Sequence, residues 1–209
     1  AAIKNGSYGK LMKAYYAKQD AEKLSGKGDT SQKLTLMKTS ADSLKKSADA
    51  LNDSSLWEKK KIKKKDEKTG EEIEVEDYDW DKITKAVKSF VEDYNDVVKE
   101  AGESNTKDVL RNASWMTGMT DKNSNMLAKI GITIGKGNKL ELDEDALKQA
   151  DISSLKTVFT GYNSFVSKIS QKATGISNAA NRASATYTNN GTYSKTDSLL
   201  TSSKIDEEV

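Results

Sequence analysis

The chain has 209 residues, of which 32% are charged, yet its formal net charge is only +2. It contains no histidine, cysteine or proline. Without histidine and cysteine, disulfide frameworks, thiolate metal sites and catalytic triads that need either residue are excluded. The near-neutral charge provides no global field that would attract nucleic acid. The absence of proline suits long helices, because proline breaks helix interiors.

Residues 1–57 are predicted to form an N-terminal helical hairpin. Its first arm, residues 7–25, carries a short apolar stripe: Tyr8, Leu11, Met12, Tyr15 and Tyr16. In its second arm, residues 30–53, apolar residues recur at spacings of 3, 4, 3, 4 and 3, which places them on one helix face: Leu34, Met37, Ala41, Leu44, Ala48 and Leu51. Asp29 and Thr30 are candidate caps for this second arm.

A charged β hairpin is predicted for residues 58–78. The run KKKIKKK at 59–65 by itself resembles a site for nucleic acid or an anionic membrane. The acidic run EIEVEDYD follows a turn-like stretch, and folding the two runs together about residues 67–70 places opposite charges across from each other. The expected pairs are Lys61 with Glu76, Ile62 with Val75, Lys63 with Glu74 and Lys65 with Glu72. We expect Trp57 and Trp80 to pack together at the hairpin's base.

A second heptad helix is predicted from Trp80 to Ala101, after a cap at Asp79 or Asp81. Its apolar stripe comprises Ile83, Val87, Phe90, Tyr94, Val97 and Ala101. Residues 105–129 are then expected to form one or two short helices with a break at Gly118. Their apolar set is Val109, Leu110, Trp115, Met116, Met119, Met126 and Leu127.

The stretch IGITIGKGNKLELDEDALKQA at 130–150 admits three interpretations. A phosphate-binding loop needs G-x-x-x-x-G-K-[ST], but the glycines here are one residue too close and Lys136 is followed by Gly137. A calcium loop needs alternating oxygen ligands, whereas Asp143, Glu144 and Asp145 are contiguous. We therefore predict a small β hairpin at 131–142, with Asp143 capping a following helix. No cofactor, metal or catalytic residue is predicted.

The longest predicted helix runs from about Asp151 to Tyr187. One stripe along it is the candidate surface for self-association or partner binding: Leu155, Val158, Tyr162, Phe165, Ile169, Ala173, Ile176, Ala180 and Ala183. Because this stripe is mostly alanine beyond Ile176, we expect the helix to fray there or to wait for a partner. Residues 188–209, rich in Ser, Thr, Lys and Asp, are expected to be a flexible tail.

The predicted fold class is mainly α. We expect an elongated antiparallel helical bundle or coiled coil with two small β hairpins, in which residues 79–187 pack with 1–57 as one bundle.

Three segments in a fixed order resemble a known family. They are VKSFVEDYNDVV at 87–98, NMLAKIGITI continued by GNKLELDEDALKQA at 125–150, and LKTVFTGYNSFVSKIS at 155–170. Together they are similar to the C-terminal region of the flagellar filament-capping protein, hook-associated protein 2, over about residues 80–187. The resemblance implies an extracellular, non-enzymatic protein that is exported through the flagellar apparatus without a cleaved signal. Its expected partners are further copies of itself, flagellin-like subunits or hook-associated helical proteins.

Two other functions remain open from the sequence. The heptads fit a non-flagellar surface adhesin or coiled-coil scaffold equally well, with a cell-surface location. A carboxylate-dependent glycan hydrolase is the third hypothesis, and it would need two acids converging in a cleft at about 5–10 Å. No run approaches the roughly 20 apolar residues that cross a bilayer, so membrane insertion is not expected.

Overall fold

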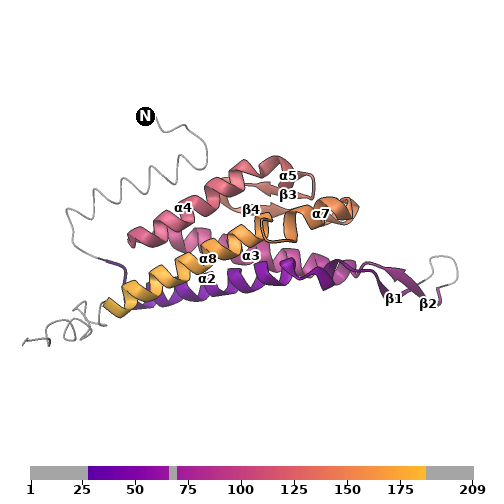
Figure 1. The fold of residues 1–209 in the computed structure, drawn as a ribbon, viewed down its shortest axis with the longest axis horizontal. Helices are drawn as coiled ribbons and strands as arrows, with labels where there is room; N and C mark the ends of the chain where they lie inside the picture. The colour runs from indigo at the N-terminus through magenta and orange to yellow at the C-terminus, as the bar shows by residue number, and fades with distance from the viewer. Residues whose placement is uncertain (1–27, 66–69, 187–209) are drawn as a thin grey trace, which may run out of the picture.

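The computed structural model describes residues 28–65 and 70–186. Four long helices dominate the fold, and Figure 1 shows them lying side by side in an elongated body. Their bounds are α2 Ser31–Asn52, α3 Trp80–Glu103, α4 Lys107–Lys122 and α8 Phe165–Thr186. The shorter helical elements are η1 Ser54–Trp57, α5 Ser124–Ala128, η2 Lys136–Asn138, α6 Glu144–Gln149 and α7 Ile152–Phe159. The strands are β1 Lys60–Lys65, β2 Glu72–Asp77, β3 Ile132–Ile134 and β4 Leu140–Leu142.

The long helices run antiparallel to their neighbours, as the course of the chain in Figure 1 shows. Helix α2 packs against both α3 and α8, and α4 completes the bundle against α8 and α3. Each helix is amphipathic, so a single core forms between them. The predicted mainly α fold with two small hairpins is confirmed. A coiled coil in the strict sense stays a prediction.

The heptad stripes of α2 and α3 form the core as predicted. All six apolar residues of the α2 stripe and all six of the α3 stripe are buried. Thr30 caps α2 by accepting a hydrogen bond from the Lys33 N–H at 3.2 Å. Asp79, rather than Asp81, caps α3 by accepting one from the Lys82 N–H at 3.0 Å. The first arm of the predicted N-terminal hairpin, residues 7–25, and the tail at 188–209 lie outside the described residues.

Asp29 has a different role from the capping one expected of it. Its carboxylate accepts hydrogen bonds of 2.6 to 2.9 Å from the connection between α3 and α4, where the donors are Ser104, Asn105 and Thr106. Burial by itself would raise the pKa of Asp29, but these hydrogen bonds outweigh it and lower the pKa. The start of α2 is thus joined to the far end of α3.

An aromatic cluster closes the end of the bundle next to the first hairpin. Trp57 stacks on Phe159 with ring centroids 5.4 Å apart, and its indole N–H donates to the Leu51 carbonyl at 2.8 Å. Phe90 contacts Phe159 and Phe165 edge to face. Trp80 instead lies against Tyr78 with ring centroids 6.4 Å apart. The expected packing of Trp57 against Trp80 is therefore replaced by separate partners for each ring.

Both predicted hairpins form, and the first has the predicted pairing. In the first, Lys61 is opposite Glu76, Ile62 opposite Val75, Lys63 opposite Glu74 and Lys65 opposite Glu72. In the second, Ile132 is opposite Leu142 and Ile134 opposite Leu140. Gly137 and Asn138 between its strands have φ angles of 70° and 64°, which glycine and asparagine tolerate best.

Two predicted helix boundaries were wrong. The expected break at Gly118 is absent, because α4 continues through this residue and ends at Lys122. The expected single helix from 151 to 187 is divided into α7 and α8 by residues 160–164. Gly161 in this connection has a φ of 98°, which no helix accommodates. Helix α8 continues past Ile176 to Thr186, close to the predicted end of the helix.

Candidate interaction surfaces

The predicted binding stripe lies mainly inside the bundle. Seven of its nine residues are almost fully buried: Leu155, Val158, Phe165, Ile169, Ala173, Ile176 and Ala180. Ala183 is partly buried against the same core, and Tyr162 lies in the connection between α7 and α8 with 82% of its surface exposed. In the chain as described, the stripe therefore packs the core and is not an open face. Binding of a partner by these residues stays a prediction.

Polar contacts hold α8 on α2 as well. The Ser177 hydroxyl donates to Asp42 at 2.6 Å, and the Ser170 hydroxyl donates to Asp49 at 2.6 Å. These two aspartates also form ion pairs with lysines one turn earlier on α2. A partner that used the α8 stripe would have to break these contacts and expose the apolar side chains beneath them.

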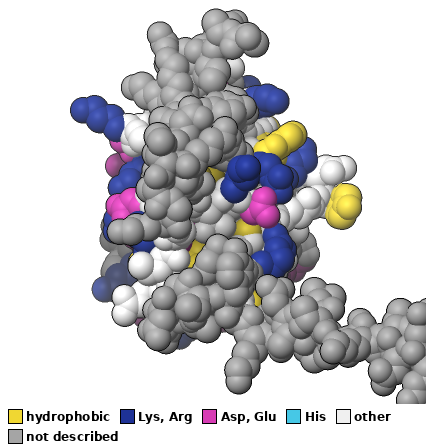
Figure 2. All heavy atoms as spheres, turned by 90° about the vertical axis from the view of Figure 1, so that its left-hand side faces the viewer, with side chains coloured by type: hydrophobic (Ala, Val, Ile, Leu, Met, Phe, Trp, Pro, Cys, Tyr) yellow, Lys and Arg dark blue, Asp and Glu magenta, His cyan; other side chains and the backbone are white. Residues whose placement is uncertain are grey.

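Trp115 is a second large aromatic residue exposed within the described part of the chain, with 62% of its area accessible. It was expected to join the apolar set of α4, but it projects outward and the Lys172 ammonium lies 5.1 Å from its ring centroid. Figure 2 shows the end of the bundle opposite the first hairpin, where basic, acidic and a few hydrophobic side chains are exposed together. Exposed Trp beside cationic residues is frequent at binding surfaces, although this ring is already partly covered by Lys172.

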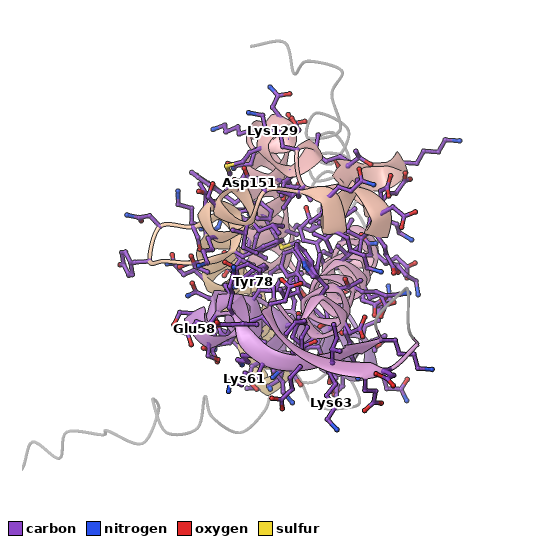
Figure 3. All side chains as sticks on the ribbon, turned by 90° about the vertical axis from the view of Figure 1, so that its right-hand side faces the viewer. Glu58, Lys61, Lys63, Tyr78, Lys129 and Asp151 are labelled. Atoms are coloured by element: carbon purple, nitrogen blue, oxygen red, sulfur yellow. The ribbon has the colours of Figure 1, made fainter. Side chains whose placement is uncertain are left out.

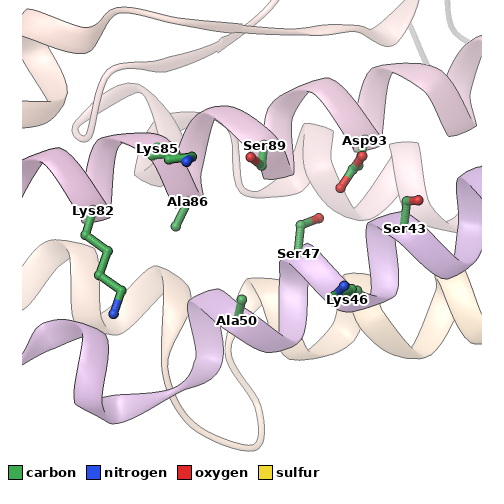
Figure 4. Close-up of a pocket in the computed structure, with 9 residues that line it drawn as sticks. All are labelled: Ser43, Lys46, Ser47, Ala50, Lys82, Lys85, Ala86, Ser89 and Asp93. Carbon is green, nitrogen blue, oxygen red and sulfur yellow. The ribbon is translucent and has the colours of Figure 1, made fainter.

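A groove of about 390 Å³ lies between α2 and α3 on their outer side (Figure 4). Its floor carries small side chains: Ser43, Ser47 and Ala50 from α2, and Ala86 and Ser89 from α3. Small residues at successive turns of two neighbouring helices leave space into which a ridge of another helix fits. Sequence reasoning missed this groove, because its residues are not apolar enough to register as a heptad stripe.

Charge surrounds the groove unevenly. Three lysines line it, Lys46, Lys82 and Lys85, together with one acid, Asp93. Ser47 and Asp93 face each other across it in Figure 4, and the Ser47 hydroxyl donates to the Leu44 carbonyl at 3.2 Å. Burial raises the pKa of Asp93, the nearby Ser47 hydroxyl opposes the rise, and the charges of Asp96 and Glu92 add to it. The groove is therefore positively charged at its rim and favours an acidic occupant.

Neither metal binding nor membrane insertion finds support in the described parts of the chain. Residues 28–65 and 70–186 bring no three acidic residues close enough together to hold a metal ion. Asp143 instead accepts hydrogen bonds from the N–H groups of Asp145 and Ala146, both at 3.0 Å, as the predicted helix cap. Among the described helices, none has both the length and the apolar character to span a bilayer.

A family model identifies the part of the chain that begins at the α3–α4 connection. Residues 104–207 match the model of the flagellar hook-associated protein 2 C-terminus. This part of the chain belongs to that family. The match contains two of the three segments on which the resemblance rested, at 125–150 and 155–170, whereas the segment at 87–98 precedes it. A comparison with curated proteins gave no significant match, and neither did a comparison with solved structures.

The hook-associated protein 2 family provides structural parts of the bacterial flagellum, so membership supports a structural, cap-like role. The matched region includes α4, the second hairpin and α8. The matched region does not include α2, the charged hairpin or α3, because these elements lie before residue 104. The groove between α2 and α3 therefore also lies outside the match.

Proposed function

We propose that the chain is a non-enzymatic assembly protein of the bacterial flagellum that associates with itself or with flagellin-like helical subunits. The observation that supports this most directly is the match of residues 104–207 to the flagellar hook-associated protein 2 C-terminus. Such a protein works outside the cell, and we propose export through the flagellar apparatus without a cleaved signal.

The α2–α3 groove is the partner site that we favour. A helix that presents small or apolar residues at every third or fourth position would insert them between Ser43, Ala50 and Ala86. Burial of apolar surface stabilises such a contact by about 25 cal/mol for each Å². Acidic residues beside that ridge would meet the lysines at the rim, which favours one partner orientation over others.

The α8 stripe is a second proposal for the partner site, and it requires a conformational change. Ile169 and Ile176 have no exposed surface in the closed bundle. Substituting either residue by Asp would therefore disturb the core whether or not a partner binds there. For this reason the groove, which is already exposed, provides the sharper test.

The test fills the groove without touching the core. Ser43→Trp and Ala50→Trp place large side chains at exposed positions in it, and Gln171→Trp at an exposed position on α8 is the matched control. Sedimentation velocity with light scattering would measure self-association, and co-sedimentation with filaments of the flagellin from the same genome would measure partner binding. We expect both groove variants to weaken association at least tenfold, and the control to leave it unchanged.

Circular dichroism separates loss of binding from loss of fold, because all three variants are expected to keep the helical content of the native chain. A native chain that stays monomeric and does not bind the filaments would contradict the proposed function. Association that all three variants retain would leave the assembly role intact but exclude the groove as its site.

A further inference from the structure

The charged hairpin separates its two kinds of charge by strand. Strand β1, KKIKKK, carries five lysines, and strand β2, EIEVED, carries four acids. Within the described parts of the chain, each of these strands pairs with the other and with no third strand. The outer edge of β1 is thus basic, the outer edge of β2 is acidic, and both have backbone groups available to another strand.

The hairpin projects beyond the end of the helical bundle (Figure 1), so the helices do not cover these edges. Seen from that end in Figure 3, Lys61 and Lys63 point away from the helices. Side chains on both strands are exposed, among them Lys63 on β1 and Glu74 on β2. The helices of the same chain therefore leave both edges of the hairpin exposed.

The charges decide which edges are compatible. Two β1 edges would place lysines opposite lysines, and two β2 edges would place acids opposite acids, both of which are destabilising. A β1 edge next to the β2 edge of another copy continues the lysine–acid alternation that already exists within the hairpin. We propose that neighbouring copies of this chain pair their charged hairpins edge to edge, β1 of one copy against β2 of the next.

This inference rests on the proposed self-association and names a contact for it. The strands of the hairpin are antiparallel, so an antiparallel β1–β2 contact between copies extends one continuous antiparallel sheet. Every β1 strand then points the same way, and all the helical bundles project from the same end of the sheet. Such a head-to-tail contact generates a closed ring or an open helical array, depending on the rotation between copies.

Apolar side chains on the hairpin favour a second copy as the occupant. Ile62 and Val75 are opposite each other, and Ile73, two residues before Val75, lies on the same face. Ile73 has 40% of its surface exposed in the single chain. In a sheet built from successive copies, the β1 strand of the neighbour would flank Ile73, and the apolar residues of all copies would share one face.

The test exchanges the charges between the strands. The swapped chain carries Lys61→Glu, Lys63→Glu, Lys65→Glu, Glu72→Lys, Glu74→Lys and Glu76→Lys. Each of its three exchanged pairs still has opposite charges, so the hairpin and the bundle are expected to form as in the native chain. Circular dichroism and thermal unfolding of the separate chains would verify this.

We expect the swapped chain to associate with itself as the native chain does. In a mixture, however, native β1 would face basic swapped β2, and native β2 would face acidic swapped β1. Co-purification of untagged native chain with a tagged swapped chain should therefore fall at least tenfold below that with a tagged native chain. A hairpin with a purely structural role predicts free mixing instead.

The other possible results distinguish failure of the edge pairing from failure of the proposed assembly role. Free mixing, or a swapped chain that stays monomeric while the native chain associates, would overturn the edge pairing and leave the assembly role standing. No association of the native chain would overturn the assembly role and the pairing together.

A crosslinking measurement checks the edge directly, since the native chain has no cysteine. Lys63→Cys copies are mixed with copies that carry one cysteine at Glu72, Glu74 or Glu76. Oxidation should join the two kinds of copy in at least one mixture, because opposite residues of paired strands come within disulfide reach. Lys63→Cys copies alone should not crosslink. Equal crosslinking in both cases would contradict the pairing.

Discussion

The two β hairpins of this chain have the same antiparallel pairing but very different surroundings. In the second hairpin, Ile132 and Leu140 are buried in the common core. Asn95 on α3 also holds it, accepting a hydrogen bond from the Leu140 N–H at 2.7 Å and donating one to the Leu140 carbonyl at 2.9 Å. In the first hairpin, cross-strand charges and a short apolar row replace these contacts, and Lys63 lies 3.5 Å from Glu72 in an exposed ion pair.

The difference shows that a hairpin can either pack into the core and stabilise the fold, or project from the bundle and remain exposed. A two-stranded sheet is marginally stable alone, so the second hairpin derives its stability from α3 and the core. At the base of the first hairpin, Tyr78 lies against Trp80, and beyond that contact the hairpin depends on pairs that each contribute about 0.2 to 1 kcal/mol. A weakly anchored, projecting hairpin contributes little to folding, which leaves its edges available for association.

The largest expected effect is a loss of folding stability when the buried second hairpin is altered. Ile132→Ala should lower the free energy of unfolding by about 2 to 5 kcal/mol, because it leaves a cavity beneath the second hairpin. Ile73→Ala in the first hairpin should change it by less than about 0.5 kcal/mol, because that side chain is exposed. Urea unfolding followed by circular dichroism measures both. Equal losses would show that the charged hairpin is also part of the framework.

A smaller loss of folding stability is expected when the two hydrogen bonds between Asn95 and Leu140, the polar clamp of the second hairpin, are removed. Asn95→Ala leaves the Leu140 N–H and carbonyl without their partner and should cost about 1 to 3 kcal/mol. Lys63→Ala removes an exposed ion pair and should cost less than about 1 kcal/mol. The same urea titration applies, and an Asn95→Ala variant as stable as the native chain would contradict the clamp.

The contact of Asp29 with residues 104–106 should contribute a stability that depends on pH, because Asp29 is charged, whereas the contact of the neutral Asn95 should not. Hydrogen bonds lower the pKa of Asp29 in the folded chain despite its burial, so the folded state binds its proton less readily than the unfolded state. The stabilisation is therefore present above the unfolded pKa of about 3.9 and is lost as pH falls through the folded value.

Asp29→Asn should cost about 1 to 2 kcal/mol at pH 7, and the difference from the native chain should shrink toward pH 3. Urea midpoints at pH 7, 5, 4 and 3 measure this, with Asn95→Ala as the variant whose cost should stay constant. A constant cost for Asp29→Asn would show that its charge does not matter.

The smallest effect concerns salt. About 1 M NaCl shortens the screening length to roughly 3 Å and should weaken the lysine–acid pairs of the first hairpin. Amide hydrogen exchange in β1 and β2, measured in dilute protein, should accelerate by about two- to fivefold, while β3 and β4 should be unaffected. Uniform acceleration in both hairpins would mean that salt destabilises the whole fold.

Much of this architecture could be predicted from local pattern. A lysine run followed after a turn by an acidic run specified the pairing of Lys63 with Glu74, and the position of Asp143 before an amphipathic segment specified a cap. The division between α7 and α8 could not be predicted in this way. Both helices bury the same side, so the stripe continues in phase across Gly161 and conceals the turn.

The candidate surfaces were less predictable than the fold. The apolar stripe of α8 was predicted as a binding surface and lies buried in the bundle, because periodicity does not say whether the covering element belongs to the same chain. Trp115 is apolar in composition and nonetheless projects beside Lys172. The groove between α2 and α3 is visible only when the small residues of two helices are placed next to each other.

The sequence by itself determined the buried stripes of α2 and α3, the presence of both hairpins, the pairing of the first hairpin and the family of residues 104–207. These features depend on residues close together in the chain or on their order along it. Only the tertiary structure decided that α2 covers the α8 stripe, that Asp29 joins the start of α2 to the far end of α3, and that the charged hairpin projects freely. These outcomes depend on contacts such as that of Asp42 with Ser177, between segments far apart in sequence, whose pairing no local pattern of charge or hydrophobicity specifies.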